Sequence, residues 1–68
     1  MLRFILTKRE KEYLNLAKED LPDKQIAQQM GVSIYTVETH RNRCRVKLGS
    51  SSKLGSVIRA IRAKYITL

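Results

Sequence analysis

The longest run of regularly spaced apolar positions falls in residues 33–49, the stretch SIYTVETHRNRCRVKLG. One helical face would be formed by Val37, His40 or Arg41, Cys44 and Leu48. Ser33 can cap the start of this helix with its hydroxyl, and Gly49 can end it in the left-handed conformation. The resulting helix would span roughly 24 Å, long enough to lie along a major groove of DNA.

The pattern upstream predicts two shorter helices. Thr7 and Glu10 have the spacing of a capping box, so the first helix should begin there and run to about residue 18. Pro22 interrupts it, since the residue before a proline avoids helical backbone angles. Pro22 is also acceptable in the first turn of a second helix, which is expected over residues 23–30.

The junction between the second and third helices has the form of a helix-turn-helix. A short helix, a turn that contains Gly31 and a longer basic helix follow one another. The small Ala27 lies four residues before Gly31, where two steeply crossing helices need a close approach, and Val37 would fill the angle between them. The sequence therefore predicts an all-α fold, a four-helix bundle that contains a helix-turn-helix.

A fourth helix should follow the polar residues 50–53, with one of the three serines as its cap. Its apolar positions are Leu54, Val57, Ile58, Ile61 and Tyr65. They cover more than one stripe of the helix. One stripe belongs to the core, and the second indicates a partner, most economically the same helix of another copy. The basic residues of this helix are expected to form a solvated face in preference to a second contact surface; these are Arg59, Arg62 and Lys64.

The chain is 68 residues long, enough for one domain over residues 1–68, with residues 1–5 as a flexible lead-in. A domain this small buries only about 60% of the surface of its unfolded chain, so its stability is marginal. Cys44 is the only cysteine, and at an apolar position it is most simply a small buried hydrophobe. The N-terminal apolar run Phe4-Ile5-Leu6 is too short for a secretory signal or a membrane span. We expect a cytoplasmic protein.

The formal charge of +8 is concentrated in the second half of the chain. Residues 1–32 hold six Lys and Arg against five Asp and Glu, and residues 33–68 hold eight against one. DNA phosphates favour such a cluster through release of counterions, whereas a membrane surface would also need a strongly apolar face. An enzyme is not expected, because there is no glycine-rich phosphate loop and no nucleophile beside a base. The single histidine and cysteine make no closed metal site, and no cofactor, small-molecule ligand or membrane partner is expected.

Five short motifs follow one another along the chain. They are Leu6-Thr7-Lys8-Arg9-Glu10, Lys24-Gln25-Ile26-Ala27, Val32-Ser33, Thr36-Val37-Glu38-Thr39-His40 and Lys47-Leu48-Gly49. In these motifs and their spacing, residues 6 to about 63 resemble the DNA-binding domain of LuxR-type transcriptional regulators, the NarL, FixJ and GerE group. The resemblance implies sequence-specific binding of double-stranded DNA, with the third helix in the major groove and a homodimer joined by the fourth. It leaves open whether the protein stands alone or is the output domain of a larger regulator.

The resemblance also assigns expected roles to single residues. The base edges would be read by Glu38, Thr39 and Asn42. Phosphate contacts are expected for Lys24, Ser33, Tyr35, Thr36, His40 and Arg41. His40 is equally a packed polar residue near the turn, and for Tyr35 the alternative is a solvated side chain. The dimer would be formed by Leu54, Val57, Ile58, Ile61 and Tyr65, and Glu10 would hold the first helix to neighbouring backbone.

Two positions depart from the family pattern. Position 38, usually Lys, is Glu38, which either accepts from a cytosine amino group or pairs with Arg41 or Asn42 along the helix. The usual Arg near the start of the fourth helix is Lys53, which keeps the charge and loses the guanidinium fork. Two other functions stay open. One is a module similar to sigma-factor region four that docks on RNA polymerase, and the other is an interaction module that binds a full-length regulator through the fourth helix.

Overall fold

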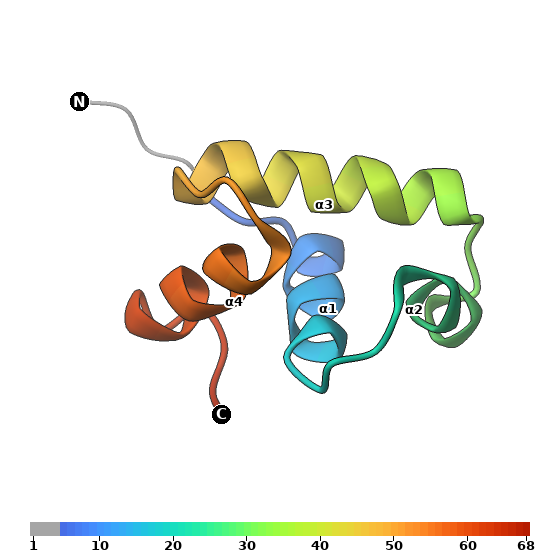
Figure 1. Ribbon diagram of the computed structural model, residues 1–68, viewed down its shortest axis with the longest axis horizontal. Coiled ribbons are helices and arrows are strands. Elements are labelled where there is room, and N and C mark those ends of the chain that lie inside the picture. The colour runs from blue at the N-terminus through green and yellow to red at the C-terminus, as the bar shows by residue number, and fades with distance from the viewer. Residues whose placement is uncertain (1–4) are drawn as a thin grey trace.

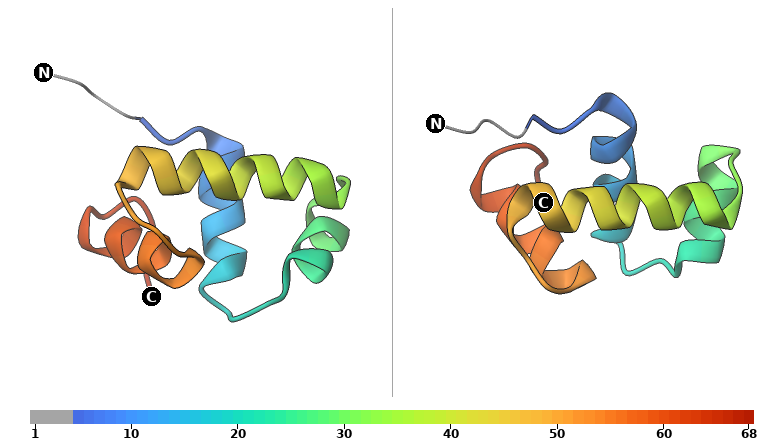
Figure 2. Two further views of the ribbon diagram at one scale, coloured as in Figure 1. Left: turned by 45° about the horizontal axis from the view of Figure 1, so that its top comes forward. Right: turned by 90° about the horizontal axis from the view of Figure 1, so that it is seen from above.

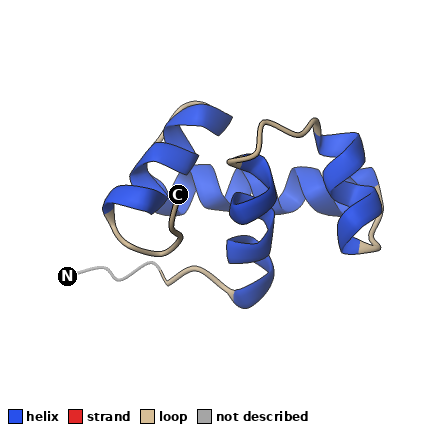
Figure 3. Cartoon of the chain, turned by 90° about the horizontal axis from the view of Figure 1, so that it is seen from below, coloured by secondary structure: helices blue, strands red, loops and turns tan. Residues whose placement is uncertain are grey.

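A computed structural model of the protein describes residues 5–68, and over these residues it contains four helices and no strand. The helices are α1 (Lys8–Ala17), α2 (Asp23–Met30), α3 (Ile34–Leu48) and α4 (Lys53–Arg62). In Figure 3 the described part of the chain is drawn as helices and loops. The predicted all-α class and the four-helix order are confirmed. Of the predicted lead-in at 1–5, residues 1–4 lie outside the described residues, and Ile5 is exposed.

Side-chain caps begin three of the four helices at the predicted positions. Thr7 Oγ1 accepts the backbone N–H of Glu10 at 3.1 Å, and Glu10 Oε1 accepts that of Thr7 at 2.9 Å, which completes the capping box. Ser33 caps α3 by accepting from the N–H three residues on. Ser52, the third of the three candidate serines, caps α4 in the same way. Each cap satisfies a backbone donor that has no partner within its own helix.

The second helix starts differently. Pro22 is its N-cap and has an extended backbone. The sequence predicted Pro22 in the first turn of this helix, and the structure places it one position earlier. No side chain caps this end. Gly31 and Gly49 end α2 and α3 with φ of +70° and +66°, the left-handed region in which glycine has no steric cost.

The three shorter helices lie on one side of the long one. In Figure 1, α3 crosses over α1, with α2 near its N-terminal end and α4 near its C-terminal end. α3 contacts each of the other three helices, whereas no Cα of α2 comes within 8 Å of a Cα of α4. The buried core comprises Leu6, Tyr13, Leu14, Ala17, Ile26, Ala27, Met30, Val37, Cys44, Val57, Ala60 and Ile66. This arrangement supports α3 along one side only.

The end of α4 corrects the sequence prediction. The helical spacing continued to Tyr65, but α4 ends at Arg62, and Tyr65 lies in the turn that follows. Lys64 adopts a φ of +64°, and the N–H of Tyr65 donates to the carbonyl of Ala60 at 2.9 Å. The chain turns there because Ile66 is 4% exposed and packs in the core, a position that a continued straight helix would not give it.

Candidate nucleic-acid interface

One face of α3 is free of the rest of the protein. Successive residues of a helix are turned by about 100°, so Tyr35, Thr39, Asn42 and Val46 share the side opposite Val37. Thr39 and Asn42 are exposed, Tyr35 is 76% exposed and Val46 is 70% exposed, whereas Val37 is fully buried. Figure 2 (right) looks down on this face, and no other described segment covers it. We call these four residues the open face of α3.

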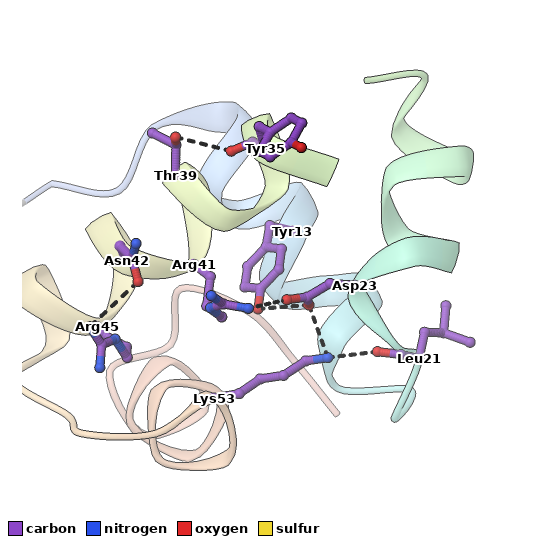
Figure 4. Close-up of polar contacts among 9 residues, drawn as sticks. All are labelled: Tyr13, Leu21, Asp23, Tyr35, Thr39, Arg41, Asn42, Arg45 and Lys53. Carbon is purple, nitrogen blue, oxygen red and sulfur yellow. Dashed lines mark hydrogen bonds and ion pairs between the residues drawn. The ribbon is translucent and has the colours of Figure 1, made fainter. Parts of the chain in front are cut away.

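The polar groups of the open face keep unused bonding capacity. Thr39 Oγ1 donates to the carbonyl of Tyr35 at 3.1 Å, so the lone pairs of the hydroxyl stay available as acceptors. Asn42 Oδ1 accepts from Arg45 at 3.4 Å, which leaves the two N–H donors of its amide unused. Figure 4 shows Tyr35 and Thr39 on the side of α3 opposite Arg41 and Asp23. This surface can therefore both donate hydrogen bonds to a neighbouring molecule and accept hydrogen bonds from it.

Glu38 lies at the edge of the open face and is half-buried. The sequence left two roles for it, a contact to cytosine or an ion pair with Arg41 or Asn42 on the same helix. In the described part of the chain it makes no such pair, because Arg41 binds Asp23 and Asn42 binds Arg45. Its carboxylate is therefore free to accept hydrogen bonds from outside the domain.

Sequence reasoning missed Val46. It follows Asn42 by four residues and Thr39 by seven, the spacing of one helical face, and this was the signal that could have found it. A shallow hollow beside it is lined by Asn42, Arg43, Val46 and Lys47. Val46 adds an apolar group to a surface that is otherwise polar and basic.

Several of the residues expected to contact phosphate lie at the N-terminal ends of α2 and α3. Lys24 is exposed in the first turn of α2. Ser33 and Thr36 hold each other through their hydroxyl oxygens, 3.1 Å apart, at the start of α3. These side chains lie where the unpaired N–H groups and the positive end of the helix dipole favour an anion.

His40 and Cys44 have different surroundings although both lie on the inner side of α3. His40 is half-buried, and its Nδ1 atom is buried without a hydrogen-bond partner among residues 5–68. Cys44 is fully buried, as predicted, and burial raises the pKa of its thiol to about 12. No group of three His, Cys, Asp or Glu side chains that could hold a metal ion occurs within the described residues.

Arg41 has an intramolecular partner that the sequence did not reveal. Its Nη1 donates to Asp23 Oδ2, which joins α3 to the first turn of α2. Arg41 follows Val37 by four residues and therefore lies about 40° from it around the helix, on the side of the core. Its side chain keeps 34% of its surface exposed. Arg41 is thus an expected phosphate contact whose charge is already paired within the domain.

Beneath α3, a buried ion pair joins it to α1. Glu10 is 1% exposed, and its Oε1 accepts from Lys47 Nζ at 2.7 Å as well as from the N–H of Thr7. Burial would raise the pKa of Glu10, but the hydrogen bonds from Lys47 and Thr7 and the charge of Lys47 outweigh it, and the pKa lies below 4.5. Glu10 thus holds the start of α1 to α3, the structural position that the resemblance implied.

The expected dimer residues fall into two groups. Leu54 is 68% exposed and Ile58 is 40% exposed, so α4 presents apolar side chains to the outside. Val57 is 6% exposed and faces the core of its own chain. Ile61 and Tyr65 are half-buried and pack against that core.

Residues 4–60 match the family model described as bacterial regulatory proteins, luxR family. The chain belongs to this family. The match covers the helix-turn-helix of α2 and α3 together with α1 and most of α4, so the geometry described above is that of a DNA-binding regulatory domain and not of an enzyme.

Similar proteins include the oxygen regulatory protein NreC of Staphylococcus aureus in strains JH9, JH1 and Mu3. Each is 40% identical over 62 residues, which is 91% of this chain and 29% of the relative. The chain thus spans less than a third of the length of these relatives. Among the described residues, no helix combines the length and the apolar character needed to cross a membrane.

Proposed function

We propose that the domain binds double-stranded DNA in a sequence-specific manner, with α3 in the major groove, to regulate transcription. The observation that carries this proposal is the open face of α3, a polar surface on a helix that the other three helices support from behind. The major groove admits one α-helix, and its base edges offer donors, acceptors and thymine methyl groups. An uncovered helix with matching groups is what direct readout requires.

The base edges are assigned to Glu38, Thr39 and Asn42. The free amide donors of Asn42 and the acceptor oxygens of Thr39 complement the edges of purines, and the carboxylate of Glu38 complements the amino group of cytosine. Val46 complements the methyl group of thymine. Each good contact of this kind contributes about 1–3 kcal/mol of discrimination between bases.

The contacts to the DNA backbone are assigned to Tyr35, at the N-terminal end of the open face, and to four residues outside this face. Ser33, Tyr35 and Thr36 start α3, Lys24 starts α2, and His40 lies at the edge of the supported side. Such contacts fix the register of the protein on the duplex and make affinity depend on salt.

We also propose that the domain forms a homodimer through α4. The exposed Leu54 and Ile58 support this part, because they give α4 an apolar surface outside the core. Ile61 follows Ile58 by three residues on the same helix and is half-buried. Two copies related by a two-fold axis would place their α3 helices on an inverted repeat with half-sites about one helical turn apart.

The test is selection from a random duplex library by the purified domain, repeated with the Thr39→Ala/Asn42→Ala variant. The matched control is Asn15→Ala/Thr67→Ala, which makes the same two changes at exposed positions of α1 and the C-terminus. We expect wild type and control to retain the same inverted repeat, and the Thr39/Asn42 variant to retain DNA without a common sequence. If that variant selects the wild-type sequence, the assignment of the reading face is wrong.

The exposed apolar residues of α4 also favour a second candidate, an interaction module that binds a full-length regulator through Leu54 and Ile58. A wild-type domain that retains duplexes without sequence preference would support that module. A domain that retains none, but binds RNA polymerase, would support a function similar to sigma-factor region four.

A further inference from the structure

Three polar side chains, one from each of the other three helices, converge on Asp23. Its carboxylate, 15% exposed, accepts from Arg41 of α3, from the hydroxyl of Tyr13 of α1 at 3.4 Å, and pairs with Lys53 Nζ of α4 at 3.2 Å. Lys53 Nζ donates in addition to the carbonyl of Leu21 at 2.7 Å. Figure 4 shows Asp23 at the centre of these groups. No other carboxylate within the described residues joins all four helices.

The position of Asp23 gives α2 a direct side-chain link to α4. The backbones of α2 and α4 do not come close to each other, but Asp23 of α2 and Lys53 of α4 form an ion pair. Asp23 lies in the first turn of α2, where the helix dipole favours its negative charge. With Arg41 it also fixes the N-terminal end of α2 against the middle of α3.

The direction of Arg41 separates it from the open face. Arg41 lies on the core side of α3, and Tyr35 and Thr39 lie on the opposite side. Its guanidinium offers a rigid set of donors that fits a carboxylate, and Asp23 occupies it.

We propose that Asp23 is a positioning residue for DNA recognition: it sets the placement of α3 relative to α2 and α4 without touching DNA, and Arg41 serves as its partner rather than as a phosphate contact. The proposal rests on the proposed function, because it concerns how α3 is held for reading. Reading requires side chains to be held within about 0.5 Å of their productive positions. Loss of the carboxylate therefore weakens discrimination between sequences more than it weakens attraction to DNA.

The test compares Asp23→Asn with Asp20→Asn in the full 68-residue chain. Asp20 is exposed in the turn before α2 and adopts a φ of +62°, which Asn also accepts, so the control removes the same charge and leaves the ion pairs intact. Affinity is measured for the duplex that wild type selects and for a scrambled duplex, over a range of salt. Circular dichroism confirms that each variant is folded at the temperature used.

We expect Asp23→Asn to reduce the ratio of specific to scrambled affinity by about tenfold or more. We also expect it to bind scrambled DNA more tightly at low salt, because Arg41 and Lys53 are released. Asp20→Asn should change the ratio by less than about twofold. If Asp23→Asn keeps the ratio seen in Asp20→Asn, Asp23 does not position the reading helix.

Arg41→Gln separates the two roles of Arg41. If Arg41 acts as the partner of Asp23, Arg41→Gln should lower the ratio of specific to scrambled affinity as Asp23→Asn does. The Asp23→Asn/Arg41→Gln double variant should then lower this ratio little more than either single variant. If Arg41 contacts phosphate, Arg41→Gln should instead weaken both duplexes alike and reduce the salt slope by about one. That outcome overturns the proposal for Arg41.

Failure of the proposed function would look different. In that case wild type itself would show no preferred duplex. The positioning role would then be decided without DNA, from residual dipolar couplings that report the angle between α2 and α3. An unchanged angle in Asp23→Asn would overturn the proposal, and a changed one would support it.

Discussion

Replacing Lys47 by Met tests whether the buried pair beneath α3 holds the recognition helix to α1. Lys47 Nζ lies 2.7 Å from Glu10 Oε1, and the carboxylate is almost fully buried. The same ammonium donates to the carbonyl of Ile5 at 3.1 Å. Lys47→Met keeps most of the aliphatic side chain and removes the charge, so a negative group is left under α3 with the N–H of Thr7 as its remaining strong donor.

The cost follows from the surroundings of this pair. Removing one partner of a buried ion pair costs about 3–5 kcal/mol. Lys47 retains 22% exposure, so water can reach its position, and Thr7 still donates to Glu10; we therefore expect about 2–3 kcal/mol. Stabilities of about 0.05–0.15 kcal/mol per residue give a chain of 68 residues only about 3–10 kcal/mol in total. The melting temperature should fall by about 10–20 °C.

The pH dependence identifies the cause. In wild type the pKa of Glu10 lies below its usual value of 4.5, so its contribution to stability is present above that pH and is lost as the pH falls through the lowered pKa. In Lys47→Met the causes that lower the pKa are reduced and burial, which raises it, remains. The variant should therefore be weakest near neutral pH, and its deficit should shrink as the pH falls and Glu10 takes up a proton.

The assay is urea unfolding followed by circular dichroism at several pH values, with Lys24→Met as the control. Lys24 is exposed in α2 and makes no ion pair within the described residues, so its variant should stay within about 0.5 kcal/mol of wild type. A deficit for Lys47→Met below about 0.5 kcal/mol, or one that does not change with pH, would refute the reasoning.

Two further predictions concern single positions. Cys44 should react with a thiol reagent in the unfolded chain and not in the native one at pH 8, because its pKa is about 12 and its sulfur is fully buried; rapid native labelling would contradict this burial. Gly31→Ala should cost about 1–2 kcal/mol in unfolding experiments, because φ is +70° and the added methyl group meets nothing within 4 Å, so the loss is conformational; an unchanged stability would show that the turn relaxes.

The helix boundaries were predictable because local chemistry determines them. Thr7, Ser33 and Gly49 act on backbone groups within a few residues, and the structure confirms each at its predicted position. The end of α4 was not predictable in this way. Its helical spacing continued to Tyr65, and only the burial of Ile66 against distant residues selects the turn at Lys64.

In the candidate site, too, the features set by local spacing were predictable and those set by distant contacts were not. Exposure of Thr39 and Asn42 follows from helical spacing once Val37 is known to face inward. The partner of Arg41 lies 18 residues earlier in the chain, and no spacing rule relates two helices before their crossing is known. The sequence left His40 and Arg41 as alternatives for the inner face, and the fold uses both, one half-buried beside the core and the other against Asp23.

The most direct test of sequence reading by α3 is a nuclear magnetic resonance titration of the domain with the duplex that it selects. We predict that the largest amide and side-chain shifts follow the open face, at Tyr35, Thr39, Asn42 and Val46, and that the side-chain amide of Asn42 changes only with the selected sequence. Shifts confined to α4, with the open face unaffected, would contradict DNA reading by α3.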